Sequence, residues 1–372
     1  MRFSKLLAVL PLLFLISLSM TGQTPEETPP PLIENDNEIL KIESRLVVIP
    51  VSVLDSAGQP VLGLTAANFK VSENNRLQEL AQVSDAEKVP LEIAILFDIS
   101  GTTNPMFEFQ QETAAKFLRE VMRPDDRATI FTIGENALLV QPRNTAEISA
   151  VSIQTIKPTK QYTAFYDTVK AASDYLENNT PKGRRKVIVV ISDGEDTNSD
   201  GVKRGFQAVY TSLGKEINTI TTSKLRNLLD NKRTEIRIKE QVKVLKSLQN
   251  ADTVFYSINP AGSSYKLNKI SVFGQENLQR FADDTGGTAF LPKFFPIDVK
   301  DTYQRESNIR RNTVTLEEIF RQLANELRAQ YLLQYYSNGE FPVNQFINLE
   351  VGLRSTANYR VRARQGYFVK PN

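Results

Sequence analysis

The sequence predicts an α/β protein: a doubly wound, mostly parallel sheet, accompanied by a small β-sandwich domain formed by the N- and C-terminal segments. Two short, largely apolar runs, 91–97 and 187–191, end in polar loops, which is typical of buried parallel strands. From residue 91 onward, strand and helix patterns alternate, which favours a parallel sheet with helices on both faces. Near both ends of the chain, apolar and polar residues alternate, which predicts half-buried antiparallel strands.

The N-terminal region has the layout of a signal peptide over residues 1–22. Basic Arg2 and Lys5 precede an apolar stretch that ends at Leu18 and is followed by an abrupt change to polar sequence. That stretch is too short to favour a membrane span, and no later stretch is apolar enough to cross a bilayer. Residues 23–38, rich in proline and acidic side chains, predict a flexible linker. We therefore expect an exported protein, periplasmic or extracellular, with no transmembrane span in its mature form.

Composition excludes several classes of function. Without Arg2 and Lys5, the 45 basic residues fall to 43, which equals the 43 acidic residues. A neutral mature chain gives no electrostatic reason to expect nucleic acid or an anionic membrane as a partner. The chain contains no His and no Cys. Their absence excludes imidazole bases, Ser-His-Asp triads, thiol nucleophiles and the usual zinc sites.

The two β segments are expected at 39–88 and 337–372. Their alternating apolar residues include Val47, Ile49, Val51 and Val53 in the first segment and Ile347, Leu349, Val351 and Leu353 in the second. Isolated two-stranded hairpins are marginal in water, so we expect the segments to pair into one sandwich although about 250 residues separate them. The outward-facing Arg360, Arg362 and Arg364 form either an anionic docking stripe or a solvated strand face.

The α/β domain is expected over residues 89–336. Its predicted elements are strand 91–98, helix 106–122, strands 127–133 and 137–141, helices 145–156 and 163–178, strands 186–192 and 252–258, helix 275–284, strand 288–292 and a final long helix. The final helix is predicted to open at Thr315, because a capping box with Glu318 precedes an apolar stripe typical of core packing.

A polar insertion, 200–250, stands where one short helix would normally join two strands. Its charges of both signs recur at helical spacing, which predicts a long surface helix or a helical hairpin. The insertion begins directly after the acidic loop 193–196. Two interpretations stay open: it gates or supplements that loop, or it is a solvated insertion without function.

Acidic and hydroxyl side chains follow the two buried strands at the point where each ends. Asp98, Ser100 and Thr102 follow the first strand, and Asp193 follows the second. In open α/β sheets, ligands bind beyond the carboxyl ends of the strands, so these residues are expected to share one mouth. Carboxylate and hydroxyl oxygens are hard ligands that suit Mg²⁺ or Mn²⁺. A lone pattern of this kind is also typical of a turn that closes a strand.

The order and spacing of these residues carry a resemblance. Asp98-Ile99-Ser100-Gly101-Thr102, then Thr163, then Asp193 within Ser192-Asp193-Gly194 resemble the metal-ion-dependent adhesion site of von Willebrand factor type A domains. The likeness covers roughly residues 88–295 and implies a type A-like, Rossmann-like fold. The flanking segments resemble the type A-related family common in acidobacterial exported proteins.

The resemblance implies a role for each residue. Ser100, Thr102 and Thr163 would offer hydroxyl oxygens to the metal, and Asp98 and Asp193 would bind mostly through water. An open position on the metal would accept a carboxylate from a partner protein. Mg²⁺ is the first choice of cation, with Mn²⁺ or Ca²⁺ as alternatives. Two departures are a Thr at position 102, where Ser is more usual, and the large residues that precede Thr163.

Three hypotheses of function follow. The leading one is a non-enzymatic, adhesion-type module that binds an acidic residue of another protein through a divalent cation. The second is a structural envelope protein whose metal site is vestigial. The third is a metal-dependent phosphohydrolase that uses Asp98, but the pattern of such enzymes needs a second Asp where Ser100 stands. Metal titration separates the first from the second, and a phosphatase assay separates the third from both.

Overall fold

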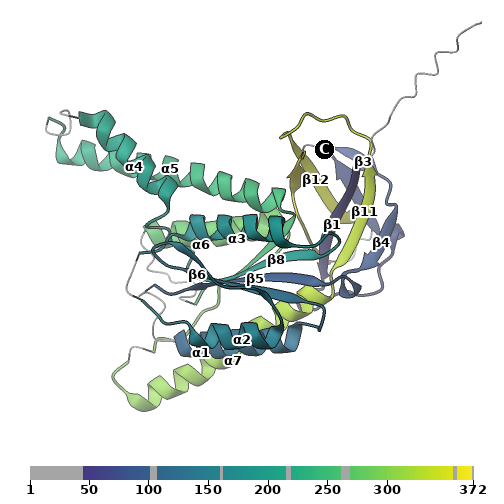
Figure 1. Ribbon diagram of the computed structural model, residues 1–372, viewed down its shortest axis with the longest axis horizontal. Coiled ribbons are helices and arrows are strands. Elements are labelled where there is room, and N and C mark those ends of the chain that lie inside the picture. Colours follow the sequence, from purple (N-terminus) through teal and green to yellow (C-terminus); the bar gives the residue numbers. More distant parts are fainter. Residues whose placement is uncertain are drawn as a thin grey trace, which may run out of the picture. The chain divides into compact units, whose positions relative to one another are not determined.

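The computed structural model describes residues 45–100, 107–159, 162–214, 219–260, 269–297, 299–354 and 358–370. The expected signal peptide, the expected linker and Thr102 lie outside these ranges. Residues Glu43–Asn372 form one compact unit. In it, a six-stranded sheet carries helices on both faces, and two four-stranded antiparallel sheets accompany it (Figure 1). No helix in the described ranges is both long and apolar enough to cross a membrane.

The six-stranded sheet has the order β10-β9-β8-β5-β6-β7. Its strands are β5 (Leu91–Asp98), β6 (Arg127–Ile133), β7 (Ala137–Asn144), β8 (Arg185–Ile191), β9 (Thr253–Ile258) and β10 (Ala289–Phe290). All neighbours pair in parallel except β6 and β7. Every residue of the central strand β5 is buried, because both faces of the sheet are covered. The predicted doubly wound, mostly parallel sheet is therefore confirmed.

Helices cover the two faces of this sheet in separate groups (Figure 1). On one face lie α1 (Phe107–Val121), α2 (Ala146–Thr155) and α7 (Thr302–Arg328); on the other lie α3 (Phe165–Asn179), α6 (Lys269–Thr285) and the C-terminal part of α5 (Thr222–Asn250). The alternation of side chains along β5 explains the division. Ile95 and Phe97 pack with α1, whereas Ala94 and Leu96 pack with α3.

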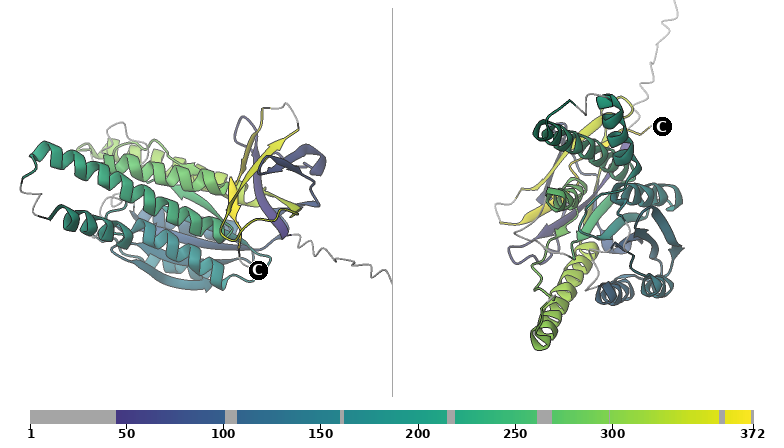
Figure 2. Two further views of the ribbon diagram at one scale, coloured as in Figure 1. Left: turned by 90° about the horizontal axis from the view of Figure 1, so that it is seen from above. Right: turned by 90° about the vertical axis from the view of Figure 1, so that its left-hand side faces the viewer.

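The polar insertion is a helical hairpin made of α4 (Asp200–Leu213) and α5. The two helices approach closely at Gly205, where an added Cβ would lie 2.8 Å from a side-chain carbon of Ile236. Val244 and Leu248 near the end of α5 join the core. The other end of the hairpin extends past the carboxyl ends of the parallel strands (Figures 1 and 2). The hairpin interpretation is thus confirmed, and its functional role stays open.

The two antiparallel sheets combine strands from both ends of the chain. One has the order β13-β1-β11-β4 and the other β14-β12-β2-β3. Their strands are β1 (Arg45–Leu54), β2 (Phe69–Glu73), β3 (Arg76–Gln78), β4 (Gln82–Asp85), β11 (Tyr331–Ser337), β12 (Phe346–Leu353), β13 (Arg360–Ala363) and β14 (Gly366–Phe368), with short 3-10 helices at Ala66–Asn68 and Ala86–Lys88. Inward side chains of both sheets form one apolar core. The predicted sandwich of N- and C-terminal segments is confirmed.

Strand β11 differs from the expectation. The predicted α/β domain ran to residue 336, but β11 pairs along β1, from Arg45 opposite Ser337 to Val51 opposite Tyr331. The reason is that α7 ends at Arg328 and the chain enters the antiparallel sheet after only two residues. The sandwich therefore begins earlier in the chain than the sequence suggested.

Two helices also begin earlier than predicted. Helix α7 starts at Thr302, where the Asp301 side chain accepts a hydrogen bond from the Gln304 N–H at 2.9 Å. Thr315 lies inside the helix and donates to the Arg311 carbonyl, so the predicted capping box is wrong. Helix α6 starts at Lys269 rather than 275.

Strand β13 and the residues after it do not present a solvated arginine face. Arg362 donates to the Gly287 carbonyl at 2.9 Å, and Arg364 pairs with Asp252 and donates to the Val48 carbonyl. Two of the three predicted surface arginines therefore join β13 and the residues after it to the α/β part of the molecule. Arg362 and Arg364 therefore form neither the predicted docking stripe nor a solvated strand face.

Candidate metal centre

The carboxyl ends of β5 and β8 place Asp98 beside Ser192. The two strands are parallel neighbours, with Phe97 opposite Ile191, so the next residue of each lies at the same edge. The Ser192 hydroxyl donates to Asp98 Oδ2 at 2.6 Å, and the Ser100 N–H donates to Asp98 Oδ1 at 2.9 Å. The strand ends thus fix both oxygens of the Asp98 carboxylate.

Asp98 is fully buried, and its charge has no basic partner among the described residues. Burial raises the pKa of this carboxyl group. Hydrogen bonds from Ser192 and Ser100 act in the opposite direction, and the negative charge of Glu195 raises the pKa further. A cation at this mouth would stabilise the ionised form that the surroundings disfavour.

Asp193 and Gly194 form a tight loop directly after β8. The Glu195 N–H donates to Asp193 Oδ1 at 3.0 Å, and the Gly194 N–H donates to the Ser192 hydroxyl at 3.0 Å. Gly194 has φ of +77°, and a Cβ there would lie 2.3 Å from the Gly274 carbonyl oxygen. Only a glycine at position 194 has this backbone conformation without strain and leaves room for the Gly274 carbonyl. The same contact explains why α6 tolerates Gly274 within its first turns.

Thr163 lies on a neighbouring loop that is tied to the loop after β8. Its N–H donates to the Thr197 hydroxyl at 3.0 Å, and its carbonyl accepts from the N–H groups of Thr197 and Asn198, both at 2.9 Å. Tyr162, one of the large residues that precede it, is 68% exposed and therefore does not fill the mouth. Gln161 lies outside the described residues.

Four of the five predicted ligands can therefore be placed. Asp98 is the last residue of β5, Ser100 and Asp193 follow β5 and β8, and Thr163 is hydrogen-bonded to the loop after β8; Thr102 lies outside the described ranges. Side chains with hard oxygen donors and no soft donors fit Mg²⁺ or Mn²⁺. Among the described residues, no group of three or more His, Cys, Asp or Glu could hold a metal. A site here depends on hydroxyl groups as well as carboxylates.

Ser192 is one residue whose role the sequence analysis missed. Its hydroxyl bridges the two loops, since it donates to Asp98 and accepts from Gly194. A hydroxyl residue directly before Asp193, at the end of a strand next to β5, was the available signal.

Asp196 is a second such residue. It accepts from the N–H groups of Tyr166 and Ser199, at 3.0 and 3.1 Å, and from the Ser199 hydroxyl. Burial, the largest cause, raises its pKa to about 6. In return, Asp167 of α3 accepts from the Asp200 N–H of α4 at 2.7 Å. Asp196 thus stabilises the positive end of α3, Asp167 stabilises that of α4, and both hold the acidic loop in place.

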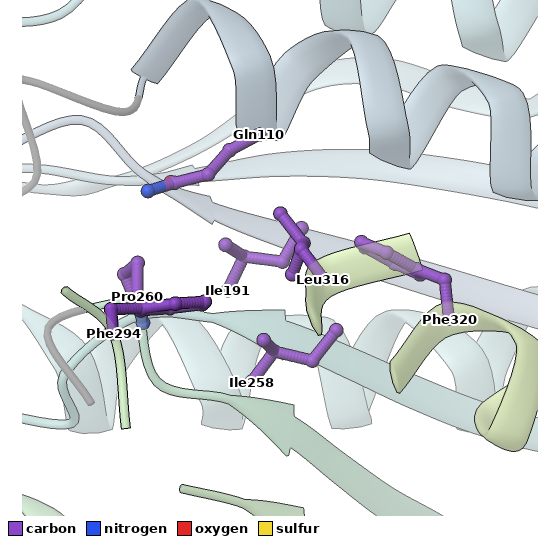
Figure 3. A pocket seen from close by; sticks show the side chains of 7 residues that line it. All are labelled: Gln110, Ile191, Ile258, Pro260, Phe294, Leu316 and Phe320. Carbon is purple, nitrogen blue, oxygen red and sulfur yellow. The ribbon is translucent and has the colours of Figure 1, made fainter. Parts of the chain in front are cut away.

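A small apolar hollow lies between α1, α7 and the ends of β8 and β9 (Figure 3). Gln110 of α1 reaches into it, and Ile191, Ile258, Leu316 and Phe320 face the same space. The hollow has no room for a water molecule. Both amide atoms of Gln110 are buried without a hydrogen-bond partner in the described part of the chain.

Substitution of Gln110 by Met is expected to stabilise the metal-free protein by about 1–2 kcal/mol, because it removes two buried, unpaired polar groups. Urea denaturation measures the change. The matched control is Gln111→Met, since Gln111 donates to the carbonyls of Ile153 and Ile156 at 2.6 and 2.9 Å and should lose about 1–3 kcal/mol. Equal losses in both variants would contradict the expectation.

Comparison with known proteins gives one family match. Residues 93–195 match the model described as von Willebrand factor type A domain, a range that runs from β5 to the loop after β8. No curated protein matches the chain. The resemblance to acidobacterial exported proteins in particular stays a prediction.

Solved structures give similarities at low identity. An aerotolerance-related membrane protein from Bacteroides fragilis is 14% identical, covering 60% of this chain and 99% of its own, with a TM-score of 0.35. BatB from Bacteroides thetaiotaomicron is 14% identical, covering 61% and 99%, with a TM-score of 0.34. Proximal thread matrix protein 1 from the mussel byssus, with a zinc-occupied MIDAS motif, is 12% identical, covering 68% and 50%, with a TM-score of 0.39.

Proposed function

We propose that the von Willebrand factor type A domain matched over residues 93–195 is a non-enzymatic binding module that engages an acidic side chain of a partner protein through a divalent cation. Asp98, Ser100, Thr163 and Asp193 would hold the cation, together with Thr102. Bound there, the metal would supply an electrophilic position for the partner's carboxylate. Hydrogen bonds from Ser192 and the Ser100 backbone to Asp98, and from the Thr163 N–H to Thr197, would hold these residues in place.

The observation that carries the proposal is the buried Asp98 carboxylate. It has no basic partner among the described residues, yet Ser192 and the Ser100 backbone hold it at the edge of the mouth. A buried carboxylate without a counter-charge is costly unless a cation compensates it. The hydroxyl groups of Ser100 and Thr163 supply neutral oxygens, so a bound divalent cation would keep part of its charge for a partner.

Nothing in the geometry favours a phosphohydrolase. Such an enzyme would use one oxygen of Asp98 to attack phosphorus and would place a second carboxylate two residues later, where this chain has Ser100. A structural protein with a vestigial site is the alternative that metal titration tests directly.

Calorimetric titration of the mature chain with Mg²⁺ and Mn²⁺ is the test. Asp98→Ala is expected to weaken metal binding at least about 100-fold, because changes in groups that only support a ligand already cost about 10- to 100-fold. Ser192→Ala, which removes the supporting hydrogen bonds to Asp98 and from Gly194 but no ligand, should cost about tenfold. The matched control is Asp125→Ala, since Asp125 is exposed and precedes β6 at the opposite edge of the sheet. Unchanged affinity in Asp98→Ala would place any metal elsewhere.

The proposal includes export to the periplasm or the extracellular space, supported by the signal-peptide pattern of residues 1–22. The mature protein is expected to begin near Gln23, which N-terminal sequencing of the native protein measures. Recovery of the intact chain from Met1 in the soluble cytoplasmic fraction would contradict export.

A further inference from the structure

A second feature lies at the opposite end of β8 from the candidate metal centre. There a cavity of about 600 Å³ opens between the outer face of β1 and β11 and the first residues of β8 and β9. Its volume falls in the range of pockets that bind small organic molecules. The strand β8 separates this cavity from Asp193 by its full length.

The cavity lining is strongly basic. Its only carboxylate among the described residues is Asp252, and its cationic side chains are Arg45, Arg184, Arg185, Lys186, Arg364 and Lys370.

Three of these cations have carboxylate partners. Arg184 pairs with the buried Glu92, Arg364 pairs with Asp252, and Lys370 lies within 3.5 Å of both Asp252 and Glu177.

Arg45, Arg185 and Lys186 form no ion pair within the described residues. The cavity therefore holds an excess of positive charge.

Arg185 is the most constrained of the three. Its side chain is buried, with 7% of the residue exposed, and its Nη1 donates to two neutral oxygens, the Leu327 carbonyl and Gln330 Oε1, both at 2.9 Å. Its Nε and Nη2 have no hydrogen-bond partner in the described part of the chain. Burial lowers the pKa of Arg185 to about 10. Both nitrogen atoms are themselves buried, so a molecule in the cavity does not reach them, but the guanidinium is a buried positive charge without the anion that would normally accompany it.

The remaining wall of the cavity is apolar. Leu46 and Val48 lie on the face of β1 that points away from the sandwich core, and they are 48% and 36% exposed. Pro50 and Leu332 line the same wall. The cavity therefore has two unlike sides. Apolar side chains of an outer strand face form one side, and cations without ion-pair partners form the other.

We propose that this cavity binds a small organic anion with an apolar body, whose acid group meets Lys186 and whose apolar part covers Leu46 and Val48. Lys186 offers a half-buried ammonium group to a carboxylate or phosphate, and the buried charge of Arg185 adds to the attraction without direct contact. The site is independent of the metal centre, so it can be tested with the metal site intact or removed.

Calorimetry on the mature chain with octanoate, 1-octanol and inorganic phosphate tests the three parts of this claim. Octanoate is expected to bind at one site. Octanol lacks the charge and phosphate lacks the apolar body, so each should bind at least about tenfold more weakly. The assignment is overturned if octanoate gives no binding, or if octanol or phosphate binds as tightly as octanoate does.

Variants locate the binding. Lys186→Gln is expected to weaken octanoate binding about tenfold through loss of a charge-assisted contact. Lys182→Gln, an exposed neighbour outside the lining, is the matched control and should change nothing. Val48→Phe fills the apolar side without touching a charge and should abolish binding while the protein stays folded. Octanoate affinity that survives both Lys186→Gln and Val48→Phe would show that the anion binds elsewhere.

Discussion

A chain that ends at Ser337 is expected to lose its sandwich and to expose the apolar face of β1. The deletion removes β12, β13 and β14, and with them Ile347, Leu349, Tyr367 and Val369 of the core. At about 1.5–3 kcal/mol for each buried side chain, the loss is roughly 6–12 kcal/mol, which is comparable to the whole stability of a domain. Strand β2 also loses β12, its long antiparallel neighbour.

Amide hydrogen exchange at residues 45–54 measures this effect, alongside aggregation in solution. The control deletes only residues 371–372. These residues follow β14, so their deletion leaves every described strand pair intact. Full protection of β1 in the chain that ends at Ser337 would show that the N-terminal strands fold without the C-terminal ones. Such a result would contradict the shared core.

Patterns that depend on near neighbours were predictable from the sequence. The buried strand β5 and the alternating strand β1 follow from the spacing of apolar residues alone, and the helical character of 200–250 follows from charges of both signs at helical spacing. The placement of Asp98 and Asp193 at one edge follows as well, because Asp98 ends one strand of a parallel sheet and Asp193 lies just beyond the end of another.

Features set by distant contacts were not predictable. Helix α7 starts at Thr302, where Asp301 caps it. The sequence around Thr315 fits the pattern of a helix N-cap equally well, so the local pattern alone did not identify the true start. Gly274 is unfavourable in a helix on local grounds. Helix α6 nevertheless includes it, because the loop at Gly194 lies too close to leave room for a side chain there. The bridge from Ser192 to Asp98 requires the register of two strands that lie 94 residues apart.

Glu73 is the strongest case of this kind, because its partners lie on the far side of the sequence. The residue is 3% exposed at the end of β2. Its carboxylate accepts hydrogen bonds from the hydroxyls of Tyr335, Ser337 and Tyr367 at 2.8, 2.9 and 2.7 Å. These partners come from β11 in one sheet and β14 in the other, so one carboxylate joins both layers of the sandwich. The negative charge of Glu73 adds to burial in raising the pKa of both tyrosines.

Substitution of Glu73 by Ala is expected to lower the free energy of unfolding by about 3–5 kcal/mol, because it leaves three buried hydroxyls without their acceptor and opens a cavity. Glu73→Gln keeps the shape and one acceptor oxygen, so it should cost only about 1–2 kcal/mol. Glu79→Ala, at an exposed position just after β3, is the matched control and should stay within about 0.5 kcal/mol of the parent. Urea denaturation of all three variants decides the matter. If Glu73→Ala were as stable as Glu79→Ala, the three hydroxyls would not depend on this carboxylate, and the two layers would be held together by apolar packing alone.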